Sequence, residues 1–129
     1  MDMIGVFKMI LSEIRVLICD DSILVRKKMT DLMTKLGCKE IYTATDGENA
    51  VEQYKTNLPD ITFMDIVMPK KTGVEALKEI LAVNPKAKVV VASSVGTQGN
   101  LKEAIEAGAY DFLQKPISDS DVEKILNRI

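Results

Sequence analysis

Two adjacent carboxylates follow an apolar run near the start of the sequence. In the stretch "VLICDDS", four apolar residues lead directly into Asp20 and Asp21. Neighbouring like charges repel each other, so a pair of acids at the end of a buried strand needs a positive partner. The pair therefore indicates a site for a cation.

Other reactive side chains follow three further apolar runs. Asp65 ends "DITFMD", Ser93 and Ser94 end "KVVVASS", and Lys115 and Pro116 follow "YDFLQ". The chain has no histidine, which excludes histidine-based triads, histidine general bases and the common histidine zinc sites. Oxygen ligands without His or Cys suit Mg²⁺ or Mn²⁺.

This set of side chains fits phosphoryl transfer. An aspartate acts as the nucleophile, and a metal ion and a lysine neutralise charge on the phosphoryl oxygens. Each residue by itself is more simply a helix cap or a strand-ending residue. Their joint occurrence after four apolar runs is what favours a functional site.

The apolar runs alternate with amphipathic stretches. This alternation predicts an α/β domain with a doubly wound parallel sheet, in which ligands gather at the carboxyl ends of the strands. Helical apolar spacing occurs, for example, in residues 25–36 and 122–129. The five predicted strands are "IRVLICD", "EIYTA", "DITFMD", "AKVVVAS" and "YDFLQ".

Turn and capping residues lie at the expected boundaries. Gly37 and Gly108 follow helical segments, where a left-handed residue commonly ends a helix. Asp46, Thr97 and Ser118 precede helical segments and are predicted to cap them.

Length and charge exclude several classes. With 129 residues the chain fits one domain, and its net charge of −2 creates no field that favours nucleic acid or anionic lipid. Cys19 and Cys38 lack metal-ligand spacing, and we expect a reducing, cytoplasmic setting. Residues 1–13 are predicted to be an extension, and residues 14–129 to be the domain. Either Met9 is the true start, or the residues before it form an extra helical turn packed on the domain.

Four motifs, "DDS", "MDIVMPKKTG", "VVVASS" and "AGAYDFLQKP", resemble those of the receiver domains of two-component response regulators, particularly the CheY-like chemotaxis regulators. The resemblance runs from about Ile14 to Ile129 and includes the spacing between the motifs. It implies a flavodoxin-like, five-stranded parallel sheet of order 2-1-3-4-5 with five helices.

The resemblance also implies a ligand set for magnesium. Asp65 corresponds to the phosphoacceptor, Asp21 to a direct Mg²⁺ ligand, and Asp20 to a ligand acting largely through water. The backbone carbonyl of Val67 completes the protein's share of the coordination.

Three more positions match residues that respond to the phosphoryl group. Ser93 corresponds to the switch hydroxyl and Lys115 to the phosphate partner, with a cis bond to Pro116. Phe112 takes the place of an aromatic side chain that swings inward on activation.

The implied function is that of a stand-alone regulator rather than a true enzyme. A sensor histidine kinase would supply the phosphoryl group. The fourth helix, fifth strand and fifth helix would then bind a downstream protein, without direct contact with nucleic acid and without membrane insertion. Self-phosphorylation and self-dephosphorylation would be the only chemistry.

Three alternatives stay open. The chain could be a receiver cut from a larger regulator. An aspartyl-nucleophile Mg²⁺ phosphatase of the haloacid dehalogenase type normally has an acid two residues after the nucleophile, where this chain has Val67. A nucleotide-binding domain would need a glycine-rich phosphate loop, and neither G-x-G-x-x-G nor G-x-x-x-x-G-K occurs.

Overall fold

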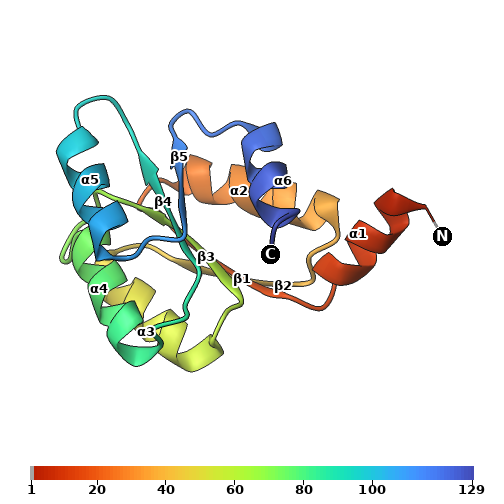
Figure 1. Cartoon of the computed structure of the whole chain (residues 1–129), viewed down its shortest axis with the longest axis horizontal. Coiled ribbons are helices and arrows are strands. Elements are labelled where there is room, and N and C mark those ends of the chain that lie inside the picture. The colour runs from red at the N-terminus through yellow and green to blue at the C-terminus, as the bar shows by residue number, and fades with distance from the viewer. Residues whose placement is uncertain (1) are drawn as a thin grey trace.

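The computed structural model describes residues 2–129 and contains a parallel sheet of five strands. The strand order is β2-β1-β3-β4-β5, which confirms the predicted doubly wound, flavodoxin-like α/β fold (Figure 1). The strands are β1 (Arg15–Cys19), β2 (Glu40–Ala44), β3 (Ile61–Asp65), β4 (Val89–Ser93) and β5 (Asp111–Gln114).

The described residues form six helices, so the prediction of five was wrong. The additional helix, α1, lies within the predicted extension, where the Asp2 side chain accepts a hydrogen bond from the Gly5 N–H and Leu11 is fully buried. The helices are α1 (Met3–Leu11), α2 (Ile23–Leu36), α3 (Gly47–Asn57), α4 (Gly73–Val83), α5 (Gln98–Ala107) and α6 (Asp119–Leu126).

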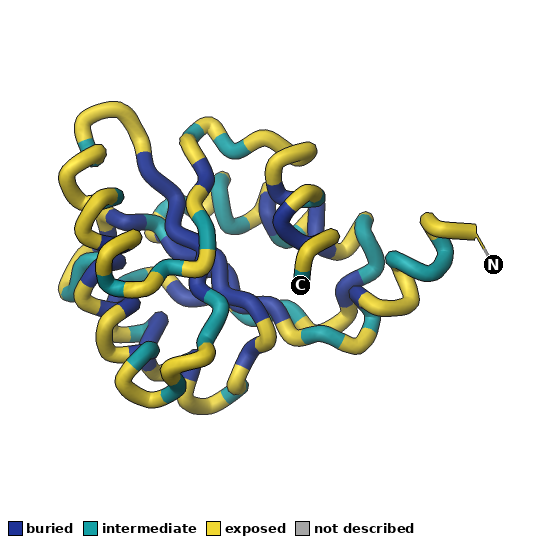
Figure 2. The backbone as a smooth tube through the Cα atoms, in the orientation of Figure 1, coloured by how far each residue is buried: buried dark blue, intermediate teal, exposed yellow. Residues whose placement is uncertain are grey.

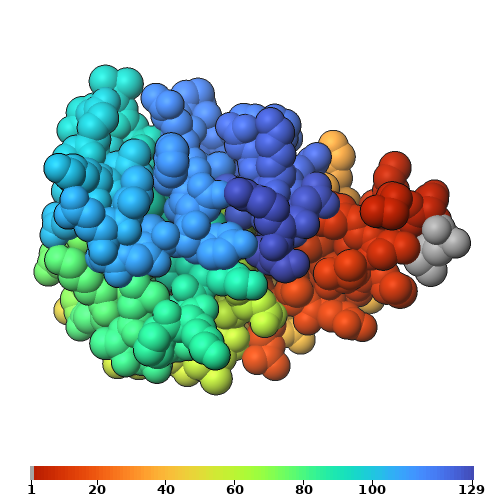
Figure 3. Space-filling view, in the orientation of Figure 1, coloured from red at the N-terminus to blue at the C-terminus, as the bar shows by residue number. Residues whose placement is uncertain are grey.

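Helices cover both faces of the sheet. Val16 and Ile18 of β1 pack in one core with residues of α2 and α6, whereas Leu17 and Cys19 pack in the other core with residues of α3, α4 and α5. The three central strands, β1, β3 and β4, are therefore buried on both sides, and this explains their nearly continuous apolar runs. The edge strands β2 and β5 keep exposed residues (Figure 2). Helix α1 extends from one end of the molecule (Figure 3).

Most of the predicted helix boundaries are confirmed. Asp46 caps α3 by accepting from the Asn49 N–H at 2.8 Å, and Ser118 caps α6. Gly37 and Gly108 end α2 and α5 with left-handed φ angles of 111° and 115°. No helix among residues 2–129 combines the length and the apolar character needed to cross a membrane.

The prediction that Thr97 caps α5 was wrong. Thr97 does precede α5, but its hydroxyl makes no hydrogen bond to the helix backbone. A turn at Gly96, which has a φ of 94°, brings the hydroxyl to the backbone of Ser94 instead.

A close backbone contact connects the end of β3 to the start of α4. Gly73 lies so near this strand end that a Cβ atom at residue 73 would be 2.2 Å from the Asp65 carbonyl oxygen and 2.7 Å from the Ile66 Cα. Both are backbone atoms, which cannot move aside as a flexible side chain would. Gly73 is therefore required for α4 to begin directly beside Asp65.

We predict that Gly73→Ala lowers the free energy of unfolding by at least about 2 kcal/mol, because the added methyl group must displace β3 or α4. The matched control is Gly99→Ala in α5, where a Cβ atom would have no neighbour within 4 Å. It should raise stability by up to about 1 kcal/mol, because alanine favours the helix. Urea unfolding of both variants measures the difference, and equal stabilities would contradict the close contact.

Candidate functional site

The carboxyl ends of β1 and β3 bring two aspartates together. In the ladder between these strands Cys19 pairs with Met64, so the following residues, Asp20 and Asp65, lie side by side. Asp21 follows on the same turn. One carboxylate oxygen from each of Asp20, Asp21 and Asp65 lies within 4.8 Å of the other two.

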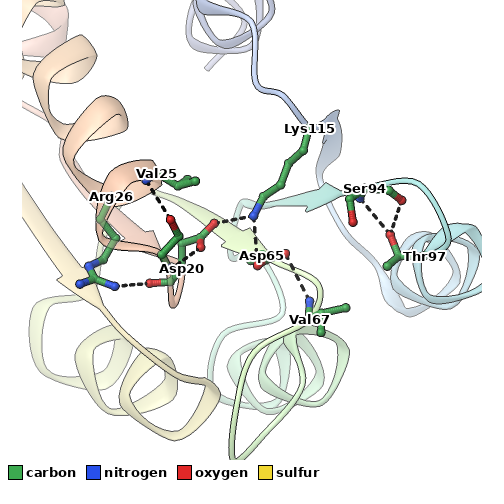
Figure 4. Close-up of polar contacts among 9 residues, drawn as sticks. Asp20, Val25, Arg26, Asp65, Val67, Ser94, Thr97 and Lys115 are labelled. Carbon is green, nitrogen blue, oxygen red and sulfur yellow. Dashed lines mark hydrogen bonds and ion pairs between the residues drawn. The ribbon is translucent and has the colours of Figure 1, made fainter.

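Lys115 reaches these acids from the end of β5. Its Nζ atom is 2.8 Å from the Asp20 Oδ2 atom and 3.1 Å from the Asp65 Oδ2 atom (Figure 4). The Lys115–Pro116 peptide bond is cis, as the resemblance implied. The ammonium thus bridges two carboxylates on different strands.

The turn that carries the acid pair is held by hydrogen bonds to Asp20. Asp20 is only 3% exposed, and its Oδ1 atom accepts from the Ser22 N–H at 2.9 Å. Arg26 on the first turns of α2 donates from Nη1 to the Asp20 carbonyl oxygen at 2.7 Å (Figure 4). Arg26 was not predicted from the sequence, although a cation one helical turn after the N-cap Ser22 was a usable signal.

The donor set fits a hard divalent cation. Three carboxylates face one ammonium, so the cluster keeps an excess of negative charge that a small cation would balance. Asp21 is exposed and offers an open side to the cluster. Val67 borders the cluster at Asp65, because its N–H donates to the Asp65 Oδ1 atom at 3.3 Å. The Val67 side chain is half exposed.

The pKa shifts describe the same charge imbalance. Burial and the neighbouring Asp20 carboxylate raise the pKa of Asp65, although the Lys115 ammonium and the Val67 N–H act in the opposite direction. Burial lowers the pKa of Lys115, but the hydrogen bonds and charges of Asp20 and Asp65 outweigh it, and the net pKa is raised. Lys115 is therefore charged, and the acids favour one further positive charge.

The two predicted switch residues lie on β4 and β5. Ser93 ends β4 and is 6% exposed, and within residues 2–129 its hydroxyl makes no hydrogen bond to the three aspartates or to Lys115. Phe112 is 49% exposed on β5, so its ring points away from the core. The structure thus brings the three aspartates, Lys115 and Ser93 to one edge and leaves Phe112 on the surface.

Comparisons with known proteins identify the family. Residues 16–127 match the model of the response regulator receiver domain. The chemotaxis protein CheY of Thermotoga maritima is 46% identical over 115 residues, which are 89% of this chain and 96% of that protein. CheY of Bacillus subtilis is 39% identical over 114 residues, 88% of this chain and 95% of that protein.

A solved structure has the same architecture. A chain of the CheX-CheY-BeF3-Mg²⁺ complex from Borrelia burgdorferi matches with a TM-score of 0.80 and 36% identity, over 86% of this chain and 84% of that one. The chain therefore belongs to the response regulator receiver domain family. Within that family it is closely related to the CheY proteins of chemotaxis.

We predict that Asp65→Asn stabilises the protein at pH 7 in the presence of a chelator. An acid with a raised folded-state pKa stabilises the fold only while it is protonated, and this contribution is lost as the pH rises through the folded-state pKa. Asparagine avoids the buried charge and its repulsion by Asp20. The advantage should therefore shrink as the pH falls to about 4, the ordinary pKa of aspartate.

Urea unfolding at several pH values measures this difference. Asp31→Asn is the matched control, because Asp31 is exposed and, among residues 2–129, forms an ion pair only with Lys27 on the same helix. It should give no stabilisation at any pH. An Asp65→Asn variant that is less stable than the wild type at pH 7 would contradict the charge imbalance described for the site.

Proposed function

We propose that this protein is a stand-alone phosphoacceptor regulator of two-component signalling, in which Asp65 receives the phosphoryl group. The observation that supports this most directly is the bridge from Lys115 to both Asp20 and Asp65. It keeps one Asp65 oxygen beside a fixed positive charge, where a transferred phosphoryl group needs charge neutralisation.

The transfer exchanges one phosphorus bond for another. A carboxylate oxygen of Asp65 attacks the phosphorus of a phosphohistidine on a sensor histidine kinase. The bond from phosphorus to the imidazole nitrogen breaks, and its electron pair stays on that nitrogen. Because the other ring nitrogen of the phosphohistidine carries a proton, the histidine leaves as a neutral imidazole, and Asp65 becomes an acyl phosphate. Water later hydrolyses this acyl phosphate and restores the carboxylate.

Magnesium is the proposed cofactor. Asp20, Asp21, Asp65 and the backbone carbonyl of Val67 would hold the ion, which would neutralise charge on the phosphoryl oxygens. The crowding of the carboxylates and the all-oxygen donor set support this assignment. The CheY relative from Borrelia burgdorferi, which was solved in a complex with CheX, BeF3 and Mg²⁺, supports it further.

The proposed output is a change in a protein-binding face. Ser93 would donate its hydroxyl to the phosphoryl group, and Phe112 would turn inward from its exposed position. The affected face is formed by α5, β5 and α6, the fourth helix, fifth strand and fifth helix of the sequence-based prediction. Exposed Ile105 and Phe112 give this face an apolar contact surface for a downstream protein.

The phosphatase alternative receives less support. A phosphatase of that type has an acid two residues after the nucleophile, which corresponds to residue 67. This chain has a half-exposed valine there, whose side chain has no proton to transfer. Asp65 therefore has no neighbour at that position to protonate a leaving alcohol.

The proposal predicts that incubation with acetyl phosphate and Mg²⁺ adds the mass of one phosphoryl group to the intact protein. Asp65→Asn should gain no mass, because the amide cannot act as the nucleophile. Asp31→Asn serves as the matched control and should behave as the wild type. Chelation of Mg²⁺ should suppress the adduct. Phosphorylation of Asp65→Asn to the same extent as the wild type would refute the assignment.

A further inference from the structure

The loop between β4 and α5 is closed by a threonine hydroxyl. Thr97 Oγ1 donates to the Ser94 carbonyl oxygen at 2.8 Å and accepts from the Ser94 N–H at 3.0 Å (Figure 4). Gln98 Oε1 accepts from the Gly96 N–H at 3.1 Å. These bonds hold residues 94–98 as a closed turn directly after the predicted switch residue Ser93.

The peptide group between Ser93 and Ser94 is held at both of its polar atoms. Its carbonyl oxygen accepts from the Lys115 N–H at 2.7 Å, and its N–H donates to the Thr97 hydroxyl. The orientation of this peptide therefore depends on the strand end that carries Lys115 and on Thr97. Because Ser93 shares the peptide, Thr97 also fixes the backbone from which the Ser93 hydroxyl projects.

Little else restrains the tip of this loop. Val95 is 84% exposed, and a Cβ atom at Gly96 would have no neighbour within 4 Å. A backbone hydrogen bond from the Thr97 N–H to the Ser94 carbonyl oxygen at 3.2 Å also closes the turn. Beyond this bond, the side-chain hydrogen bonds of Thr97 and Gln98 are the main local constraint on the turn. Removing the Thr97 hydroxyl would loosen the loop without opening either core.

We propose that Thr97 is a positioning residue that latches the Ser93–Ser94 peptide in its resting orientation. This rests on the proposed function, in which Ser93 moves to reach a phosphoryl group on Asp65. That movement carries the following peptide with it and breaks the contact between Ser94 and Thr97. The latch stabilises the resting state, so part of the free energy from the phosphoryl contacts is needed to break it before the protein switches.

The test measures the affinity of the full chain for beryllium fluoride in the presence of Mg²⁺. Amide chemical shifts recorded during the titration are the readout. Thr97→Val has nearly the same shape as threonine but cannot form the latch. It should bind beryllium fluoride about fivefold more tightly than the wild type, the effect expected for the loss of a neutral hydrogen bond from the resting state alone. Thr97→Ser keeps the hydroxyl and should retain wild-type affinity.

Two controls separate the latch from a general loss of structure. Thr34→Val removes a hydroxyl that donates to the Thr30 carbonyl on α2, far along the chain from the loop, and should leave affinity unchanged. The affinity for Mg²⁺ alone should be equal in all variants, because the Thr97 hydroxyl bonds to the Ser94 backbone and not to the three aspartates. A merely structural role for Thr97 would not raise the affinity for the phosphoryl mimic.

The latch would be overturned if Thr97→Val bound beryllium fluoride no more tightly than the wild type. It would also be overturned if Thr97→Ser bound it as tightly as Thr97→Val does. If the wild type binds beryllium fluoride and Thr97→Val does not differ from it, the latch alone fails. If the wild type does not bind beryllium fluoride with Mg²⁺, the proposed function fails and the latch fails with it.

Discussion

The Nζ atom of Lys115 lies 2.8 Å from an Asp20 oxygen and 3.1 Å from an Asp65 oxygen, and the site depends on this one cation between two strand ends. Asp20 is nearly inaccessible to water, so its charge needs a nearby partner. The sheet order supplies one, because β1 and β3 are neighbours and β5 ends close enough for a lysine to span β4. With Asp21 added, negative charge remains in excess.

The rest of the fold holds the three carboxylates together although they repel one another. The central strands, which are buried on both faces, give the sheet a large apolar core, and this core offsets the cost of crowding carboxylates at one edge. Gly73 lets α4 begin against the backbone of Asp65, and Arg26 holds the carbonyl of Asp20. Both contacts restrain the backbone, so the acids cannot relieve their repulsion by moving apart.

The sequence predicted the features that follow from periodicity and strand direction. Alternating apolar runs specify buried parallel strands, and residues directly after those strands must share one edge, so Asp65 and Lys115 could be assigned to one site. The α1 helix was one of two alternatives that the sequence left open for the N-terminal residues, because a short apolar stretch does not show whether it packs on the domain. Two features depend on geometry that a motif does not contain. These are the second carboxylate bonded by Lys115 and the orientation of the Thr97 hydroxyl, which a turn at Gly96 directs to Ser94 rather than to α5.

The proposed chemistry depends on magnesium binding to the excess negative charge at this edge. Calorimetric titration with Mg²⁺ of the wild type, Asp21→Asn and Asp31→Asn tests this most directly, because both variants lose one exposed carboxylate. We predict that Asp21→Asn weakens Mg²⁺ binding by more than about tenfold, whereas Asp31→Asn binds as the wild type does. Equal affinities in all three proteins would contradict a magnesium site at the three aspartates.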